Sequence, residues 1–194
     1  MSAPGRLGLA FLVAASLLAI ACGAPPDKEL QQAQGAIEAA RAAGADQYAH
    51  DEFVAAEDAL KHAREAVDER DYRLALNHAL DSLEHAQNAA REAADRKATA
   101  RSDADRAIAD ATAALNRVRA TLKTAETARV PARTSAEARR VITDSDGRLQ
   151  KARAAFGRGD YLGAAAAVTG ATPRLLATAR DLDAAAAAAA KRRR

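Results

Sequence analysis

An internal repeat is the feature that most constrains how this chain can fold. Residues 60–83 and 149–172 share the same residue at seven positions, at a constant offset of 89. The matched pairs are Leu60 and Leu149, Ala63 and Ala152, Arg64 and Arg153, Ala66 and Ala155, Asp71 and Asp160, Tyr72 and Tyr161, and Ala75 and Ala164. Self-similarity at a fixed offset indicates two copies of one structural unit. We therefore expect a helical hairpin that occurs twice.

Each hairpin is predicted to be two helices joined by a tight turn. Apolar residues recur at spacings of three and four on both sides of residues 69–71, which places one apolar stripe on each helix. In the first copy the stripes are Phe53, Ala56, Leu60, Ala63 and Val67, then Tyr72, Leu76, Ala79, Leu83, Ala86 and Ala90. Asp71 and Asp160 are predicted N-caps, because a short carboxylate accepts the free N–H groups of a first helical turn.

The repeat extends upstream of the hairpin, so each copy is predicted to contain three helices. A helix is expected over residues 27–43, with Gly44 as its stop. Its apolar stripe returns at an offset of 85, where Leu30, Ala33, Ile37 and Ala40 match Leu115, Val118, Leu122 and Ala125. Residues 45–130 contain neither glycine nor proline, and residues 72–128 are therefore predicted to form one continuous helix.

Later helix boundaries are predicted from proline and from capping residues. Pro131 should end the continuous helix, and Thr134 with Glu137 is expected to cap the next one, which runs to Phe156. The last helix is predicted to begin at Asp160. Pro173 should kink or break it.

The N-terminus has the anatomy of a secretory signal. An apolar run from Leu7 to Ala21 follows one charged residue, and it is too short for a comfortable membrane span. The ending Leu18-Ala19-Ile20-Ala21-Cys22 resembles the lipobox of bacterial lipoproteins. The resemblance implies cleavage before Cys22, a diacylglycerol on its sulfur, and, from Gly23, sorting to the outer membrane facing the periplasm. Cys22 is the only cysteine, so no intrachain disulfide can form.

These observations predict an all-α protein: an elongated, antiparallel, coiled-coil-like bundle of two tandem three-helix units that share a long central helix. The expected segments are a signal peptide at 1–21, a tether at 22–26, an acidic unit at 27–100, a basic degenerate copy at 101–190 and a basic tail at 191–194. Seams lined by alanine allow close approach of helix axes but bury little apolar area.

Charge differs strongly between the two copies. Residues 27–97 hold 9 basic and 16 acidic side chains, whereas residues 98–194 hold 19 and 10. Three interpretations remain open: binding of an anionic envelope surface by the basic half, self-association of acidic against basic units, and a plain solvated surface. Nucleic acid is not an expected partner, because no aromatic residues alternate with the basic ones.

Only one set of residues resembles a metal site. His62, His78, Asp81 and His85 carry suitable ligand atoms, but the helical period places His78 and His85 nearly opposite the stripe of Leu76 and Leu83. The second copy has no equivalent set. The sequence therefore predicts no metal, no cofactor and no catalytic residue, and the protein is not expected to be an enzyme.

Residues 26–90 resemble an uncharacterised all-helical domain family of bacterial envelope lipoproteins, whose members often precede an OmpA-like peptidoglycan-binding domain. The resemblance is carried by Gly44-Ala45, Tyr48-Ala49, Glu52-Phe53, Ala56, Leu60, Ala63, Asp71-Tyr72, Ala75 and Ala79. Here a second degenerate copy stands in place of the OmpA-like domain.

The expected function is that of a lipid-anchored helical scaffold or spacer of the cell envelope. Its expected partners are the membrane, through the lipid, and an envelope protein, peptidoglycan or a second copy of the chain. The alternative is a binding module whose basic C-terminal half captures peptidoglycan or lipopolysaccharide.

Overall fold

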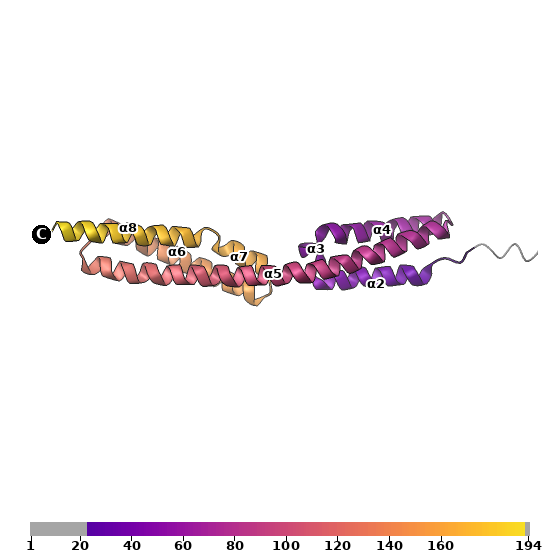
Figure 1. The fold of residues 1–194 in the computed structure, drawn as a ribbon, viewed down its shortest axis with the longest axis horizontal. Helices are drawn as coiled ribbons and strands as arrows, with labels where there is room; N and C mark the ends of the chain where they lie inside the picture. Colours follow the sequence, from indigo (N-terminus) through magenta and orange to yellow (C-terminus); the bar gives the residue numbers. More distant parts are fainter. Residues whose placement is uncertain (1–22, 193–194) are drawn as a thin grey trace, which may run out of the picture. The chain divides into compact units, whose positions relative to one another are not determined.

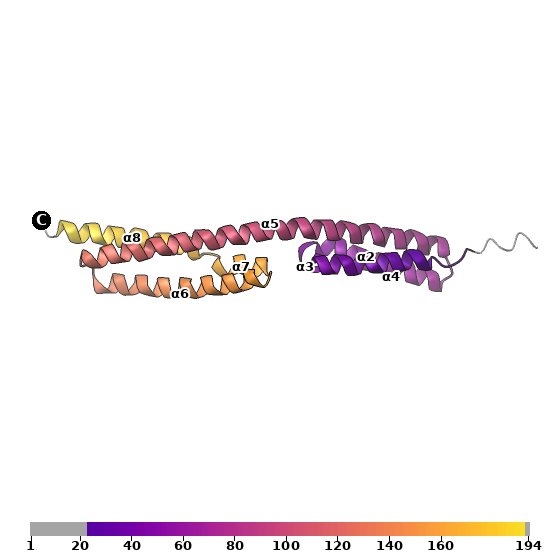
Figure 2. The ribbon, with the colours of Figure 1, turned by 90° about the horizontal axis from the view of Figure 1, so that it is seen from below.

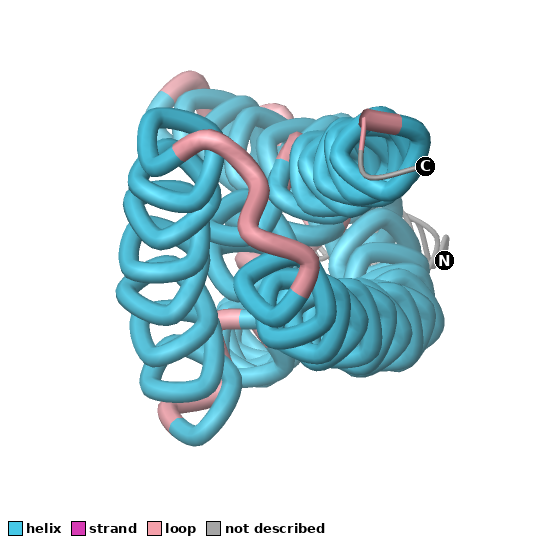
Figure 3. The backbone as a smooth tube through the Cα atoms, turned by 90° about the vertical axis from the view of Figure 1, so that its left-hand side faces the viewer, coloured by secondary structure: helices cyan, strands magenta, loops and turns pink. Residues whose placement is uncertain are grey.

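The structure is a computed structural model that describes residues 23–192. Within that range the backbone forms seven helices and no strand (Figure 3). The helices are α2 (Asp27–Ala43), α3 (Ala45–Tyr48), α4 (His50–Asp68), α5 (Tyr72–Thr127), α6 (Ala132–Gly157), α7 (Tyr161–Val168) and α8 (Ala171–Lys191). The predicted all-α class and the single helix after the first hairpin turn are both confirmed.

The chain divides into two compact units between Arg96 and Lys97. In unit 1, helices α2 and α4 lie side by side with the first part of α5 (Figures 1 and 2). In unit 2, helices α6, α7 and α8 pack with the remaining part of α5. Each unit is thus a helical bundle, in which α5 takes part twice.

Alanine dominates the centre of unit 1. Nine of its alanines on the three long helices are 0% exposed: Ala33, Ala40, Ala56, Ala63, Ala75, Ala79, Ala86, Ala89 and Ala93. Larger buried groups are few and include Ile37, Phe53 and Leu60. Small side chains let helix axes come near the short end of the usual 8–10 Å separation.

The predicted inner face of α5 in unit 1 is partly wrong. Its most buried line is Ala75, Ala79, Ser82, Ala86, Ala89 and Ala93, whereas Leu76 and Leu83 are only half-buried. Helix α5 packs against two helices at once, so the middle of its buried arc lies between the two contacts. The closest approach occurs there and admits only small residues.

Unit 2 is built around larger side chains at the corresponding places. Its core contains Leu115, Val118, Val141, Leu149, Leu175 and Leu182. At the offset of 89, Ala86 of unit 1 corresponds to Leu175, and Ala93 corresponds to Leu182. The two units therefore share a pattern of burial but fill it with different volumes.

Both hairpin turns have the same backbone conformation. Arg70 and Gly159, which are equivalent at the offset of 89, adopt the left-handed region with φ of 62° and 81°. In each turn the amide of the following aspartate donates to a carbonyl five residues earlier, Asp71 to Ala66 and Asp160 to Ala155. The carboxylates of Asp71 and Asp160 then accept from the amides of Leu74 and Gly163, as predicted for N-caps.

Replacing Arg70 with glycine should raise the free energy of unfolding of unit 1 by about 0.5–1 kcal/mol. A left-handed backbone costs an L-residue about 1–2 kcal/mol, and glycine removes this cost. The greater conformational freedom of glycine in the unfolded chain offsets part of the resulting stabilisation. Urea unfolding followed by circular dichroism measures the change. The matched variant Gly159→Ala should destabilise unit 2, and a destabilised Arg70→Gly protein would contradict the argument.

Two predicted local features are wrong, and one short helix was not predicted. Helix α6 begins at Ala132, and no side chain caps it. Its N-cap residue is Pro131, and the amide of Thr134, the predicted cap, donates to the Pro131 carbonyl instead. The last helix breaks at Thr169 and Gly170, not at Pro173. Pro173 is tolerated in the first turn of α8, because backbone N–H groups at this position have no hydrogen-bond partner within the helix. The link after Gly44 contains the short helix α3.

Candidate interaction surfaces

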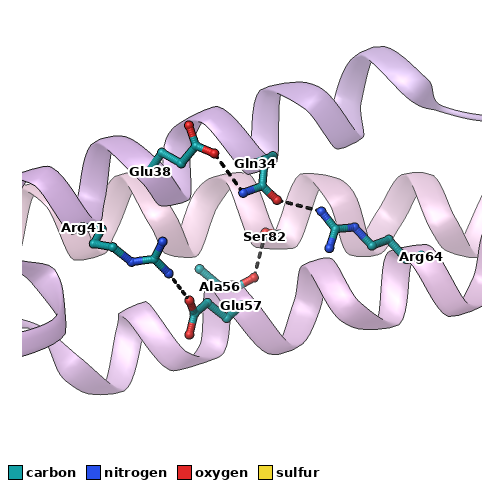
Figure 4. Close-up of polar contacts among 7 residues, drawn as sticks. All are labelled: Gln34, Glu38, Arg41, Ala56, Glu57, Arg64 and Ser82. Atoms are coloured by element: carbon teal, nitrogen blue, oxygen red, sulfur yellow. Dashed lines mark hydrogen bonds and ion pairs between the residues drawn. The ribbon is translucent and has the colours of Figure 1, made fainter.

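Polar side chains bridge α2 and α4 at the edge of the seam in unit 1. Arg41 donates to Glu57 at 2.6 Å, and Arg64 donates to the side-chain oxygen of Gln34 at 2.7 Å (Figure 4). The Gln34 amide in turn donates to Glu38 on the same helix. These groups are exposed, so the ion pair of Arg41 and Glu57 contributes no more than about 1 kcal/mol. They connect the two helices along the edge of the seam.

Ser82 is the one fully buried polar side chain of unit 1 among the described residues. Its hydroxyl donates to the backbone carbonyl of Ala56 at 2.8 Å, from α5 across to α4 (Figure 4). A hydroxyl that is satisfied in this way is part of the packing between helices. It does not offer a nucleophile to solvent.

His78 and His85 lie nearly opposite Leu76 and Leu83, as predicted, but that stripe is not the centre of the buried face of α5. His85 Nδ1 lies 2.8 Å from a Glu52 carboxylate oxygen, and the rings of His62 and His78 are 5.6 Å apart. Both contacts join α4 to α5 at the side of the alanine line. They form two separate pairs, and no group of three or more His, Cys, Asp or Glu residues within 23–192 is arranged to hold a metal ion.

Unit 2 presents a surface rich in cations that the protein itself leaves unpaired. Four arginines form ion pairs: Arg119 with Asp146, Arg139 with Glu126, and Arg148 and Arg174 both with Asp144. The other lysines and arginines of residues 97–192 form no ion pair with any described residue. Their charge remains available to a partner.

One shallow pocket of about 300 Å³ gathers two of these unpaired cations. Arg117 of α5 and Arg180 of α8 line it together with Pro173 and Leu176. Two arginines beside two apolar side chains suit an anionic group attached to a hydrocarbon, since one guanidinium group can donate to two oxygens of a carboxylate or phosphate. This pocket lies wholly within unit 2.

Four further unpaired cations form a line along α6. Arg133, Arg140, Lys151 and Arg158 are exposed and are separated by 7, 11 and 7 residues. Steps of 7 and 11 residues return to nearly the same side of a helix with 3.6 residues per turn. We call these four residues the basic row. The sequence did not predict this row, because spacing alone does not show which cations are exposed and unpaired.

The equivalent side of α4 carries the opposite charge. Asp51, Asp58 and Glu69, separated by 7 and 11 residues, are exposed and form no ion pair with a described residue. We call these three residues the acidic row. At the offset of 89, Asp51 corresponds to Arg140 and Glu69 to Arg158. The repeat therefore displays one helix face twice, with its charge reversed.

The predicted lipid site and signal segment, residues 1–22, lie outside the described residues, as do the last two arginines of the basic tail. In the described part, none of the helices combines the length and the apolar character needed to cross a bilayer.

Residues 28–104 match the model of a domain of unknown function, DUF4398. The matched stretch begins at the second residue of α2, covers the rest of unit 1 and includes the next eight residues of α5. No curated protein and no solved structure matched the chain.

Proposed function

We propose that the protein is a lipid-anchored helical scaffold of the bacterial cell envelope, without a catalytic role. The observation that carries the proposal is the packing of its helices. Alanine-lined or leucine-lined seams fill the space between the helices of each unit, and the polar groups at these seams are used in contacts between helices. The surfaces left for function are the charged outer faces of the helices.

The anchor in this proposal is the lipobox that ends at Cys22. Four residues, 23–26, separate the lipidated cysteine from α2. Such a tether holds the N-terminal end of unit 1 close to the membrane surface. By the same resemblance, Gly23 favours the periplasmic face of the outer membrane.

The DUF4398 match supports the resemblance on which this proposal draws. We propose that the domain is of the envelope-lipoprotein type. The second unit then takes the place that an OmpA-like domain has in the members of that type. A scaffold extended by its own degenerate copy gains surface without gaining a new fold.

The proposed anchor predicts the behaviour of a Cys22→Ala variant. Without the thiol no diacylglyceryl group can be attached, so labelling with a palmitate analogue should be lost and the precursor should accumulate. Gel mobility and fluorescence of the labelled protein measure both effects. Ser16→Ala, in the middle of the apolar run, should remain labelled. Labelling of Cys22→Ala at the level of the unmodified protein would refute the anchor.

A second candidate function is favoured by the unpaired cations of unit 2. In that case unit 2 captures an anionic polymer or lipid of the envelope, with Arg117 and Arg180 as one contact point. Retention on purified peptidoglycan sacculi at low and high salt separates the two functions. Binding that disappears at high salt, and in an Arg117→Glu/Arg180→Glu variant, favours the binding module. A scaffold without this activity is not retained at either salt concentration.

A further inference from the structure

We infer that the basic row on α6 of one copy of the chain binds the acidic row on α4 of a second copy. This inference rests on the scaffold role proposed above and names a partner for it. Three observations carry it: the charge of the two rows, their exposure without internal partners, and their spacing.

The two rows have complementary charge and are free to pair. None of Asp51, Asp58 and Glu69 forms an ion pair with a described residue, and none of the four cations of the basic row does. Asp144, which lies beside the basic row on α6, already forms ion pairs with Arg148 and Arg174. Glu137 also lies beside the row on α6, and it forms no ion pair with a described residue.

The rows are straight, because 18 residues make five complete turns of an α-helix. Asp51 and Glu69 are 18 residues apart, as are Arg140 and Arg158, and also Arg133 and Lys151. Glu69 and Arg158, the residues that follow α4 and α6, retain right-handed helical backbone angles and so continue each row. Two straight rows can lie along each other over about 27 Å at 1.5 Å per residue.

The spacing matches in both directions. In an antiparallel arrangement Asp51, Asp58 and Glu69 face Arg158, Lys151 and Arg140. In a parallel arrangement the same three anions face Arg133, Arg140 and Lys151. Either arrangement places each of the three anions opposite a cation of the basic row. Attachment of the chains to one membrane would raise their local concentration, which favours contacts of this weak, charge-driven kind.

Zero-length carbodiimide cross-linking tests the contact, because it joins a lysine amine to a carboxylate only when the two touch. The purified full chain in non-ionic detergent is mixed in equal amounts with its ¹⁵N-labelled form, and cross-linked peptides are identified by mass spectrometry. The expected product joins Lys151 of one isotope to Asp58 of the other, or to Glu69 if the helices are parallel. Lys123, an exposed and unpaired lysine on α5, is the internal control and should give at least tenfold less product.

Charge exchange provides the matched variants. Arg140→Glu/Lys151→Glu should abolish the cross-linked dimer, as should Asp58→Lys/Glu69→Arg, and a mixture of the two variants should restore it. Arg106→Glu/Lys123→Glu, which changes the net charge equally on α5, should leave the cross-linked dimer intact.

The inference is overturned if cross-linked products between the two isotopes are absent at low salt, or if mixing the two exchanged variants does not restore the dimer. It is also overturned if the basic row retains the monomeric chain on sacculi instead. Lipid labelling at Cys22 tests the anchored scaffold separately, so the two proposals can fail independently.

Discussion

Replacing Leu175 with alanine is expected to lower the free energy of unfolding of unit 2 by about 2–5 kcal/mol. Leu175 is 0% exposed and lies in the core cluster with Val118, Leu149 and Leu182. Its removal loses the transfer free energy of the side chain and leaves a cavity that the surrounding helices can close only in part. The loss is large for a domain of about a hundred residues, since such domains are stable by only about 5–15 kcal/mol.

The neighbouring residue supplies the control for this experiment. Leu176 is 37% exposed, so Leu176→Ala should change the free energy of unfolding by much less. Urea unfolding followed by far-ultraviolet circular dichroism measures both variants against the unmodified chain. Equal effects at the two positions would show that the core of unit 2 is not where the structure places it.

The reverse substitution at the equivalent place in unit 1 should also destabilise. Ala86 corresponds to Leu175 and is 0% exposed. Ala86→Leu forces three additional carbons into a seam that is lined by alanine on the facing helices. We expect a loss of about 1–3 kcal/mol from unit 1, with unit 2 unaffected.

Ala94 lies on the same helix, faces solvent and is the matched control for overpacking. Ala94→Leu should leave the unfolding midpoint of unit 1 within experimental error, because leucine and alanine differ little in helix propensity. If Ala86→Leu were as stable as Ala94→Leu, the helices of unit 1 would have to be further apart than the structure indicates.

Much of the fold could be predicted because the sequence contains strong local signals. Gly44 and the turn at residues 69–71 mark helix ends, and the absence of glycine and proline from residues 45–130 predicts the continuity of α5. Asp71 and Asp160 hold the N-cap positions that their side chains suggest. These signals act over one or two helical turns and do not depend on distant contacts.

The errors arise where the outcome depends on tertiary packing. A hydrophobic stripe predicts one inner face, but α5 in unit 1 contacts two helices, so small residues lie in the centre and Leu76 and Leu83 lie at its edge. Because the buried face of α5 is centred on the alanine line, His78 and His85 lie at the seam with α4, although they are nearly opposite Leu76 and Leu83. An apolar period cannot reveal how many neighbours a helix has.

The candidate interaction surfaces could be predicted only in part. The difference in charge between the two halves is visible in the sequence, but which cations are already paired depends on geometry. Asp144, for example, forms ion pairs with both Arg148 and Arg174, whereas Arg140 on the same helix forms no ion pair with a described residue. The two charged rows emerge once exposure and pairing are considered together with spacing.

Mass spectrometry of the N-terminal peptide, from protein isolated with the membranes of its host, tests the proposed lipid-anchored scaffold most directly. The account predicts a mature chain that begins at Cys22 and carries the mass of a diacylglyceryl group on its sulfur. A chain that retains residues 1–21, or a mature Cys22 without lipid, would contradict it.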